Sequence, residues 1–307
     1  MIKLLKGDCL IESDKIESGS VDLILTDLPY GNMNTDGGRK LGINGWDLAI
    51  EPKKVFEIAN RILRKNGKMI LFSQEPYTTK LITEAIPNVP FNYRATWEKD
   101  NFAVALGAKV NMVSFTEDIL IFSKGDCYNA ITPLRKIMFK YAEKYGKDYL
   151  IDLLIKEGRY TSDLSARVHT DYKFGTGKGK RFDFIGKTMY EYLSNFIEFE
   201  ETFEELKQIH NEYKIKYGST FNLWEGKKYK SNILKYKKDY DGHHPTQKPV
   251  LLLEDLIKTF SNENDLLVDL TMGSGSTLVA CKNTNRNGIG IEMNDEYYYI
   301  ACKRVGL

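Results

Sequence analysis

The stretch of sequence that decides the fold reads Leu266-Leu267-Val268-Asp269-Leu270-Thr271-Met272-Gly273-Ser274-Gly275-Ser276-Thr277. A short apolar strand is followed there by a glycine-rich turn and by the beginning of a helix. Gly273 and Gly275 let the backbone approach a ligand closely, and Ser276 or Thr277 can cap the helix. The turn lacks the glycine spacing of dinucleotide-binding folds and the Gly-Lys-Ser/Thr of a P-loop, so phosphate binding is disfavoured.

The sequence on either side continues this alternation of helices and strands. A helix is expected over Lys248–Phe260, a strand over Gly288–Glu292 and a closing helix over Asp295–Lys303. The strand ends in Glu292, and an acid at this position holds ribose hydroxyls in nucleoside-binding sheets. The glycine turn and the acid together indicate a nucleoside-binding site.

The N-terminal part of the chain shows the same pattern. Strands are expected over Ile2–Asp8, Val21–Asp27, Lys68–Ser73, Tyr93–Glu98 and Glu117–Ser123, and helices over Glu51–Arg64 and Glu75–Ile86. Such alternation predicts an α/β fold with a mixed, mostly parallel sheet and helices on both faces. The middle of the chain interrupts this alternation of strands and helices. We therefore expect a sheet assembled from both chain ends, residues 1–124 and 243–307, with residues 125–242 inserted as a separate module.

A second stretch places polar residues at the C-terminal end of a strand: Val21-Asp22-Leu23-Ile24-Leu25-Thr26-Asp27-Leu28-Pro29-Tyr30-Gly31. Ligands of open α/β sheets bind at this end of the strands. The turn, which Pro29 fixes, can aim the Asp27 carboxylate and a backbone carbonyl at one amino group while Tyr30 stacks on the ring that carries it. An ordinary exit from strand to loop is the alternative, because Asp and Pro are common turn residues.

Two further regions carry chemically suggestive residues. His243-His244-Pro245-Thr246-Gln247-Lys248-Pro249 opens a helix and can line a pocket, but its histidines lack an acid or cysteine partner at recognisable spacing, so no metal site is expected. The middle of the chain holds two basic stretches, Lys173–Arg181 and Lys227–Lys238, and an acidic, helix-like stretch, Glu191–Glu205. The alternative for the basic stretches is a solvated surface, as for most lysine runs.

Composition excludes several classes of protein. The chain has 307 residues, of which 42% are hydrophobic and 28% charged, so a wholly disordered chain is excluded. Its net charge is only +2, from 44 basic and 42 acidic residues, and indicates no nucleic-acid partner by itself. No apolar run is long enough to span a membrane, and an acid comes too early for a signal peptide. The 4 cysteines form no Cys-x-x-Cys pair, which favours reduced thiols in a cytosolic protein.

Taken together and in this order, the motifs resemble those of the S-adenosylmethionine-dependent amino-group DNA methyltransferases, specifically the permuted β-class. Asp27-Leu28-Pro29-Tyr30 is similar to the catalytic Asp-Pro-Pro-Tyr tetrapeptide of that family, and Gly7-Asp8-Cys9-Leu10 is similar to its adenine-contacting element. His244–Pro249 and Asp269–Thr277 resemble its two main cofactor motifs, and Glu292 falls where the ribose is expected. The resemblance implies a Rossmann-like methyltransferase sheet with an inserted target-recognition module.

The resemblance also implies roles for individual residues. The implied catalytic residues are Asp27, Leu28, Pro29 and Tyr30. The implied cofactor-binding residues are Asp8, Cys9, Asp27, His244, Lys248, Pro249, Asp269, Leu270, Met272, Gly273, Ser274, Gly275, Ser276, Thr277, Glu292 and Met293. In this context the basic clusters become expected DNA contacts: Arg39, Lys40, Lys178, Lys180, Arg181, Lys227, Lys228 and Lys230. No residue is expected to bind a metal.

The chemistry follows from the weak nucleophilicity of an exocyclic amine, whose lone pair is delocalised into the ring. Asp27 and the Leu28 carbonyl can accept both amino hydrogens, so that the lone pair points at the sulfonium methyl and transfer needs mainly positioning and electrostatics. Leu28 stands in place of the family's first proline but still has its carbonyl. Methylation of cytosine carbon 5 is disfavoured, because no cysteine of this chain follows a proline.

The resemblance therefore predicts a site-specific methyltransferase that acts on the N6 amino group of adenine in double-stranded DNA, since Asp27 occupies the position that Ser usually takes in cytosine-N4 enzymes. The base must be flipped out of the duplex, and residues 32–47 form a glycine-rich loop suited to close over it. Cytosine-N4 methylation and a catalytically silent, cofactor-sensing DNA-binding protein are the alternatives. A cytoplasmic protein of a bacterium or phage is expected, with a homodimer partner and a cognate restriction endonuclease left open.

Overall fold

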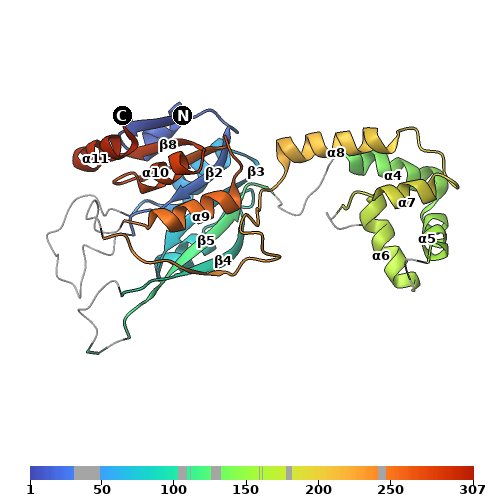
Figure 1. Ribbon diagram of the computed structural model, residues 1–307, viewed down its shortest axis with the longest axis horizontal. Helices are drawn as coiled ribbons and strands as arrows, with labels where there is room; N and C mark the ends of the chain where they lie inside the picture. The colour runs from blue at the N-terminus through green and yellow to red at the C-terminus, as the bar shows by residue number, and fades with distance from the viewer. Residues whose placement is uncertain are drawn as a thin grey trace. The chain divides into compact units, whose positions relative to one another are not determined.

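The computed structural model describes residues 1–30, 49–102, 109–110, 112–125, 133–158, 160, 162–177, 182–240 and 247–307, with the backbone alone for 215 and 216 (Figure 1). The chain divides into two compact units. One comprises Met1–Gly125 together with Ser219–Leu307, and the other comprises Asp126–Gly218.

The first unit contains a sheet built from both ends of the chain. Within the described residues it has eight strands in the order β1-β8-β7-β2-β3-β5-β4-β6. The strands are β1 (Ile2–Lys6), β2 (Val21–Thr26), β3 (Leu63–Ser73), β4 (Phe91–Glu98), β5 (Thr116–Ser123), β6 (Ile233–Lys235), β7 (Leu266–Asp269) and β8 (Asn287–Glu292). Only β5 runs antiparallel to its described neighbours β3 and β4, and the remaining pairs are parallel. The mixed, mostly parallel sheet predicted from the sequence is confirmed.

Helices cover both faces of this sheet. They are α1 (Cys9–Glu12), α2 (Pro52–Ile62), α3 (Tyr77–Thr83), α9 (Val250–Phe260), α10 (Ser276–Asn283) and α11 (Asp295–Val305), with a short 3₁₀ turn at Ser13–Lys15. In β2, Ile24 packs into the same cluster as α2 and α3, whereas Leu23 and Leu25 pack into the cluster of α9, which lies in front of the sheet in Figure 1. Burial on both faces explains why β2 is an almost unbroken apolar run.

The order of the strands positions the functional residues. Because β2 lies between β3 and β7, and β8 lies beside β7, the strand of the predicted catalytic motif is parallel to both strands of the predicted cofactor motifs. The carboxyl ends of parallel strands meet at one edge of a sheet. Asp27, Asp269 and Glu292 therefore come to the same edge, although 242 residues separate the first two in sequence.

Residues Asn66 and Gly67 lie between the expected helix Glu51–Arg64 and the expected strand Lys68–Ser73, but they do not separate a helix from a strand, because β3 already begins at Leu63 and includes both. Asn66 adopts a positive φ of 63°, and its N–H donates to the Lys124 carbonyl. A Cβ at Gly67 would lie 3.0–3.1 Å from backbone oxygens, among them that of Asp22. The pair is therefore an irregularity inside the strand, opposite a register shift in β2.

The second unit is helical and has its own hydrophobic core. Its helices are α4 (Pro133–Tyr145), α5 (Lys147–Lys156), α6 (Asp163–Phe174), α7 (Lys187–Leu193) and α8 (Phe203–Tyr217). Leu134, Met138, Leu154, Phe174 and Leu206 are buried together in this core. Burial of each side chain of this size contributes about 1.5–3 kcal/mol.

The prediction of one helical stretch over Glu191–Glu205 is wrong. Helix α7 ends at Leu193 and α8 begins at Phe203. A capping box starts α8: the Glu205 N–H donates to Thr202 Oγ1 over 3.3 Å, and the Thr202 N–H donates to Glu205 Oε2 over 2.7 Å. The acidic residues in this stretch belong partly to the connection between two helices.

The end of the insert also differs from the expected boundary at residue 242. The structure joins the chain from Ser219 onward to the sheet unit. Strand β6 pairs with β4, and Trp97 Nε1 donates to the Tyr236 carbonyl over 2.8 Å. These partners are more than 130 residues apart in sequence, and a three-residue strand gives little local signal.

Candidate active site

Asp27 follows β2 directly and is the centre of a polar cluster. Both of its carboxylate oxygens have partners: Tyr30 Oη donates to Oδ1 over 2.8 Å, and Lys248 Nζ donates to Oδ2. Leu28 is buried in the core under α2 and α3, which anchors the turn below Asp27. Three of the predicted residues, Asp27, Tyr30 and Lys248, are thus brought together, and the lysine contacts the predicted catalytic acid.

Two members of the cluster were not predicted from the sequence. Glu117, on β5, accepts a hydrogen bond from Tyr30 Oη over 3.1 Å and lies 3.0 Å from Lys248 Nζ through the same oxygen, Oε1. Its other oxygen, Oε2, lies 2.7 Å from the Nζ of Lys99, which follows β4. Lys99, Glu117 and Lys248 have side chains only 3%, 6% and 8% exposed. Together with Asp27 they form a cluster of two carboxylates and two ammonium groups, so that each buried charge lies next to a charge of opposite sign.

The environment sets the protonation of this cluster. Burial raises the pKa of the Asp27 carboxyl, and the neighbouring Glu117 charge adds to the rise while Lys248 opposes it. Burial alone would lower the pKa of Lys248, but the two carboxylates more than compensate, so its pKa is raised and it stays a cation. Burial and the same carboxylates raise the pKa of Tyr30, which therefore remains a neutral hydrogen-bond donor.

The glycine-rich turn lies between β7 and α10. Gly273 and Gly275 have positive φ angles of 49° and 82°, which residues other than glycine rarely adopt. A Cβ at Gly275 would also lie 2.9 Å from the Ala301 Cβ. Gly275, rather than Ser276 or Thr277, takes the N-cap position of α10. The turn can therefore present bare backbone to a ligand.

Glu292 faces this turn from the end of β8. Its Oε2 accepts from the Gly273 N–H over 2.9 Å, and its Oε1 accepts from the Asn294 N–H over 2.7 Å. Burial raises the pKa of the carboxyl. Each oxygen of a carboxylate has a second lone pair, so a backbone-fixed Glu292 can still accept from a ribose hydroxyl.

The predicted adenine-contacting element lies beside Glu292. The Gly7 N–H donates to the Glu292 carbonyl over 2.9 Å and so joins the end of β1 to the end of β8. Asp8 caps α1 by accepting from the Leu10 N–H over 2.9 Å. Cys9 is buried, which raises the pKa of its thiol to about 12 and keeps it protonated.

Hydroxyl groups connect the cofactor turn to the catalytic strand. Thr26 Oγ1 donates to Asp269 Oδ1 over 2.8 Å, and Thr271 Oγ1 donates to the backbone carbonyl of Asp27 over 2.9 Å. The two hydroxyl oxygens are themselves 2.8 Å apart. Burial raises the pKa of Asp269 to about 6. The position of the catalytic turn is therefore coupled to that of the glycine-rich turn.

The other predicted cofactor residues of this region support the turn. Leu270 and Met272 are buried in apolar clusters, and Thr277 is also buried. Arg304 Nη1 donates to the side chains of Ser274 and Ser276 over 3.0 and 2.9 Å. Pro249 precedes α9 as its N-cap, and Met293 is 60% exposed. His244 lies outside the described residues.

The predicted DNA contacts fall into three groups. Arg39, Lys40, Lys178, Lys180 and Arg181 lie outside the described residues, as does the loop 32–47. Lys227 and Lys228 are exposed, and Lys227 pairs with Glu225. Lys230 is only 12% exposed and pairs with Glu225 over 3.0 Å and with the buried Asp255 over 2.5 Å.

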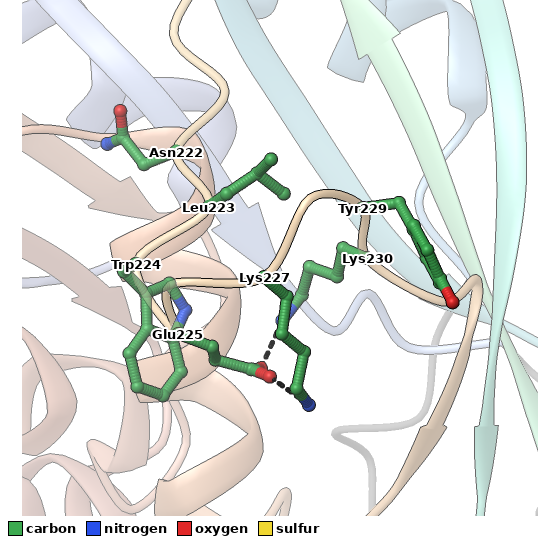
Figure 2. A pocket seen from close by; sticks show the side chains of 7 residues that line it. All are labelled: Asn222, Leu223, Trp224, Glu225, Lys227, Tyr229 and Lys230. Carbon is green, nitrogen blue, oxygen red and sulfur yellow. Dashed lines mark hydrogen bonds and ion pairs between the residues drawn. The ribbon is translucent and has the colours of Figure 1, made fainter.

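Figure 2 shows a hollow lined by residues between Asn222 and Lys230, in which Lys227 and Lys230 both point at Glu225. Lys230 also lies over the Trp224 ring, and Trp224 Nε1 donates to Asp255 over 3.0 Å. The hollow contains none of the predicted catalytic or cofactor residues. The geometry gives Lys230 a structural role, whereas contacts of Lys227 and Lys228 with DNA remain predictions.

The sheet, its glycine-rich turn facing an acid, and the Asp-Leu-Pro-Tyr end of β2 together define a methyltransferase-type fold. The family model described as DNA methylase, which covers N6 and N4 methyltransferases, matches residues 21–303. The chain belongs to this family, and the membership predicted from the motifs is confirmed.

Individual relatives agree with the family. The chain is 37% identical over 317 residues to the type II methyltransferase M2.LlaDCHI of Lactococcus lactis subsp. cremoris, with 98% of this chain and 88% of the relative covered. It is 26% identical over 306 residues to the DNA adenine methyltransferase YhdJ of Escherichia coli (strain K12), with 98% and 82% covered. In fold it is similar to the solved M1.HpyAVI–SAM complex, with a TM-score of 0.55, 20% identity and 100% of both chains covered.

Proposed function

We propose that this protein transfers a methyl group from S-adenosylmethionine to the N6 amino group of adenine in double-stranded DNA. The observation that carries the proposal is the position of Asp27 at the end of β2, where Thr271 of the glycine-rich turn donates to its backbone carbonyl. One relative that the chain matches along most of its length is a DNA adenine methyltransferase. Asp27 at the head of the tetrapeptide is typical of adenine enzymes.

The residues of the glycine-rich edge fit the cofactor. Gly273 and Gly275 have no side chains that would keep a ligand from the backbone of the turn, and Glu292 is held by two backbone N–H groups with lone pairs left for ribose hydroxyls. Asp8 and Cys9 follow the end of β1, next to Glu292, where the adenine ring would lie. Bound S-adenosylmethionine supplies an electrophilic methyl group on a sulfonium centre.

The chain's own residues then orient the nucleophile. The Asp27 carboxylate and the Leu28 carbonyl accept the two amino hydrogens, which turns the nitrogen lone pair toward the methyl group. Tyr30 is held at its hydroxyl by Asp27 and Glu117, so its ring is fixed for stacking on the flipped base. Flipping costs a few kcal/mol, which contacts with DNA must offset.

We further propose that the helical unit, Asp126–Gly218, contains the target-recognition module. Its separate core allows it to vary without disturbing the sheet. Phosphate contacts position such a module and base-edge contacts specify the sequence. A homodimer and a cognate restriction endonuclease remain predictions from the family resemblance.

None of the helices in the described residues has the length and the apolar composition that a membrane span requires.

Methylation-sensitive sequencing of DNA from cells that express the chain tests the function directly. We expect N6-methyladenine at one short recognition sequence, and no such mark in cells that express Asp27→Ala. N4-methylcytosine would show that the base was assigned wrongly. Absence of any mark, with S-adenosylmethionine still bound by the purified protein, would favour the silent DNA-binding alternative.

A further inference from the structure

Each oxygen of the Asp27 carboxylate already accepts from one donor in this structure. Tyr30 Oη donates to Oδ1 over 2.8 Å, and the Lys248 ammonium donates to Oδ2. A target amino group that donates to Oδ1 has to share this oxygen with the Tyr30 hydroxyl, because only the second lone pair is open. The amino group is bound more strongly when the hydroxyl donates elsewhere, but a released hydroxyl hydrogen that stayed buried and unpaired would cost about 1–3 kcal/mol.

Glu117 provides a second acceptor for one of these donors. Tyr30 Oη lies 2.8 Å from Asp27 Oδ1 and 3.1 Å from Glu117 Oε1 in the same arrangement of the ring. A phenol has a single hydrogen, so the hydroxyl satisfies one carboxylate fully at a time. Rotation of the O–H bond alone moves that hydrogen from Asp27 to Glu117, and the ring need not move.

Glu117 is itself held rigidly in place. It is paired with Trp97 in the register of β4 and β5, and its Oε2 lies 2.7 Å from Lys99 Nζ. Lys99 in turn lies over the Trp97 ring. Among the described residues, the charged and titratable groups that act on Glu117 are Asp27, Tyr30, Lys99, Lys238 and Lys248.

We propose that Glu117 is a positioning residue for methyl transfer, which takes the Tyr30 hydroxyl hydrogen so that Asp27 can accept the target amino group. No covalent bond forms or breaks in this exchange, and Tyr30 remains a neutral phenol throughout. The ring of Tyr30 keeps its place for stacking while its hydroxyl changes partner. The role rests on the proposed function, because it requires an amino group as substrate.

Glu117→Gln is the discriminating substitution. Glutamine has one acceptor oxygen, whereas Lys99 lies on one oxygen of Glu117, and the Tyr30 hydroxyl and Lys248 share the other. We expect the amide oxygen to stay on the Lys99 ammonium. Tyr30 and Lys248 then both lose an acceptor, and the loss at Lys248 does not depend on whether residue 30 carries a hydroxyl. The Tyr30 hydroxyl would then remain on Asp27. Glu98→Gln is a matched control. Glu98 is partly exposed, precedes Lys99 of the cluster in sequence and pairs with Lys235.

The test measures the single-turnover rate of radiolabelled methyl transfer to mixed-sequence DNA in a double-mutant cycle with Tyr30→Phe. We expect Glu117→Gln to lower the rate by about 10- to 100-fold in the wild-type background, as for loss of a hydrogen bond to a charged group. In the Tyr30→Phe background, which has no hydroxyl to release, its effect on the rate should be smaller by at least about threefold. Cofactor affinity should stay within about threefold of the wild type in every variant.

Equal costs of Glu117→Gln in the two backgrounds would overturn the proposal, since a merely structural role is independent of the Tyr30 hydroxyl. A rate for Glu117→Gln equal to that of the Glu98→Gln control would overturn it as well. If Glu117→Gln fails to fold, Tyr30→Phe with Glu117→Asp, which shortens the side chain and keeps the charge, completes the same cycle. Failure of the proposed function is recognised separately, because the wild type itself would then transfer no methyl group.

Discussion

Asp269 is a buried acid whose protonation should affect folding more than chemistry. Its carboxylate accepts from Thr26 and from the Thr271 N–H, yet burial raises its pKa to about 6. In the unfolded chain an aspartate has a pKa of about 3.9. The folded state therefore binds more protons between these values, and the stabilising contribution of this group is complete below about pH 4 and is lost as the pH rises through 6.

Asp269→Asn should remove this pH dependence. The wild type should lose about 2–3 kcal/mol of unfolding free energy from this group between pH 4 and pH 7, and the variant should not. The measurement is the difference between the two proteins in chemical denaturation across this pH range, because other carboxyls titrate in both. A constant difference would mean that the pKa of Asp269 is not raised.

Glu292→Ala should weaken the cofactor site. Loss of the ribose contact should cost about 1–3 kcal/mol of binding free energy, measured by calorimetric titration with S-adenosylmethionine. The Gly273 and Asn294 N–H groups also lose their acceptor, so thermal unfolding of the variant serves as the control. Unchanged cofactor affinity would place the ribose elsewhere.

The residues of the recognised motifs could be predicted from the sequence, but their partners could not. Asp27, Tyr30 and Lys248 all belong to the motifs singled out in the sequence, but the contact between Lys248 and Asp27 was not predicted. Glu117 and Lys99 were missed because their contacts depend on β5 lying between β3 and β4, which no local pattern reveals. A buried strand that begins with an acid is the one signal that could have singled out Glu117.

At the scale of elements, the segment between β6 and the helical unit is fastened to α9 through Asp255. This buried carboxylate accepts from Trp224 and Tyr236 and pairs with Lys230. Lys230→Met should therefore destabilise the protein by about 3–5 kcal/mol, because it leaves a buried charge without its counterion. Equilibrium denaturation in urea measures the change.

Lys228→Ala is the matched variant in the same segment. Lys228 is exposed, so its replacement should leave stability unchanged. If it contacts a phosphate, it should lower the slope of log DNA affinity against log salt by about 0.9. An effect of Lys230→Met on the salt slope without an effect on stability would reverse the roles given to these two lysines.

Most strands and helices of the sheet unit could be predicted within a few residues, because their periodicity is strong and each is buried on a defined face. The predictions failed where tertiary contacts or helix caps determine where an element begins or whether it forms. The capping box at Thr202 starts a new helix inside the acidic stretch, and β6 exists through its pairing with β4.

At the scale of the whole molecule, the sheet brings together site residues from opposite ends of the chain. Strand β2 leads to Asp27, the proposed nucleophile-orienting acid, and β7 and β8 lead to the glycine-rich turn and to Glu292, the proposed cofactor site. The Thr26–Thr271 contact joins the two halves within hydrogen-bond distance. The mostly parallel order and the assembly from both ends were predictable, because the strand–helix alternation is interrupted only by the insert.

The central claim is that the Asp27 carboxylate orients the target adenine amino group for methyl transfer. The most direct measurement compares purified wild type and Asp27→Asn in single-turnover reactions, with N6-methyladenine quantified by mass spectrometry of the digested DNA and cofactor affinity measured in parallel. The one acceptor oxygen of the asparagine should be taken by Lys248. The account predicts a loss of N6-methyladenine formation of at least about 100-fold, with cofactor affinity within about threefold of the wild type. An Asp27→Asn protein that forms N6-methyladenine at the wild-type rate would contradict it.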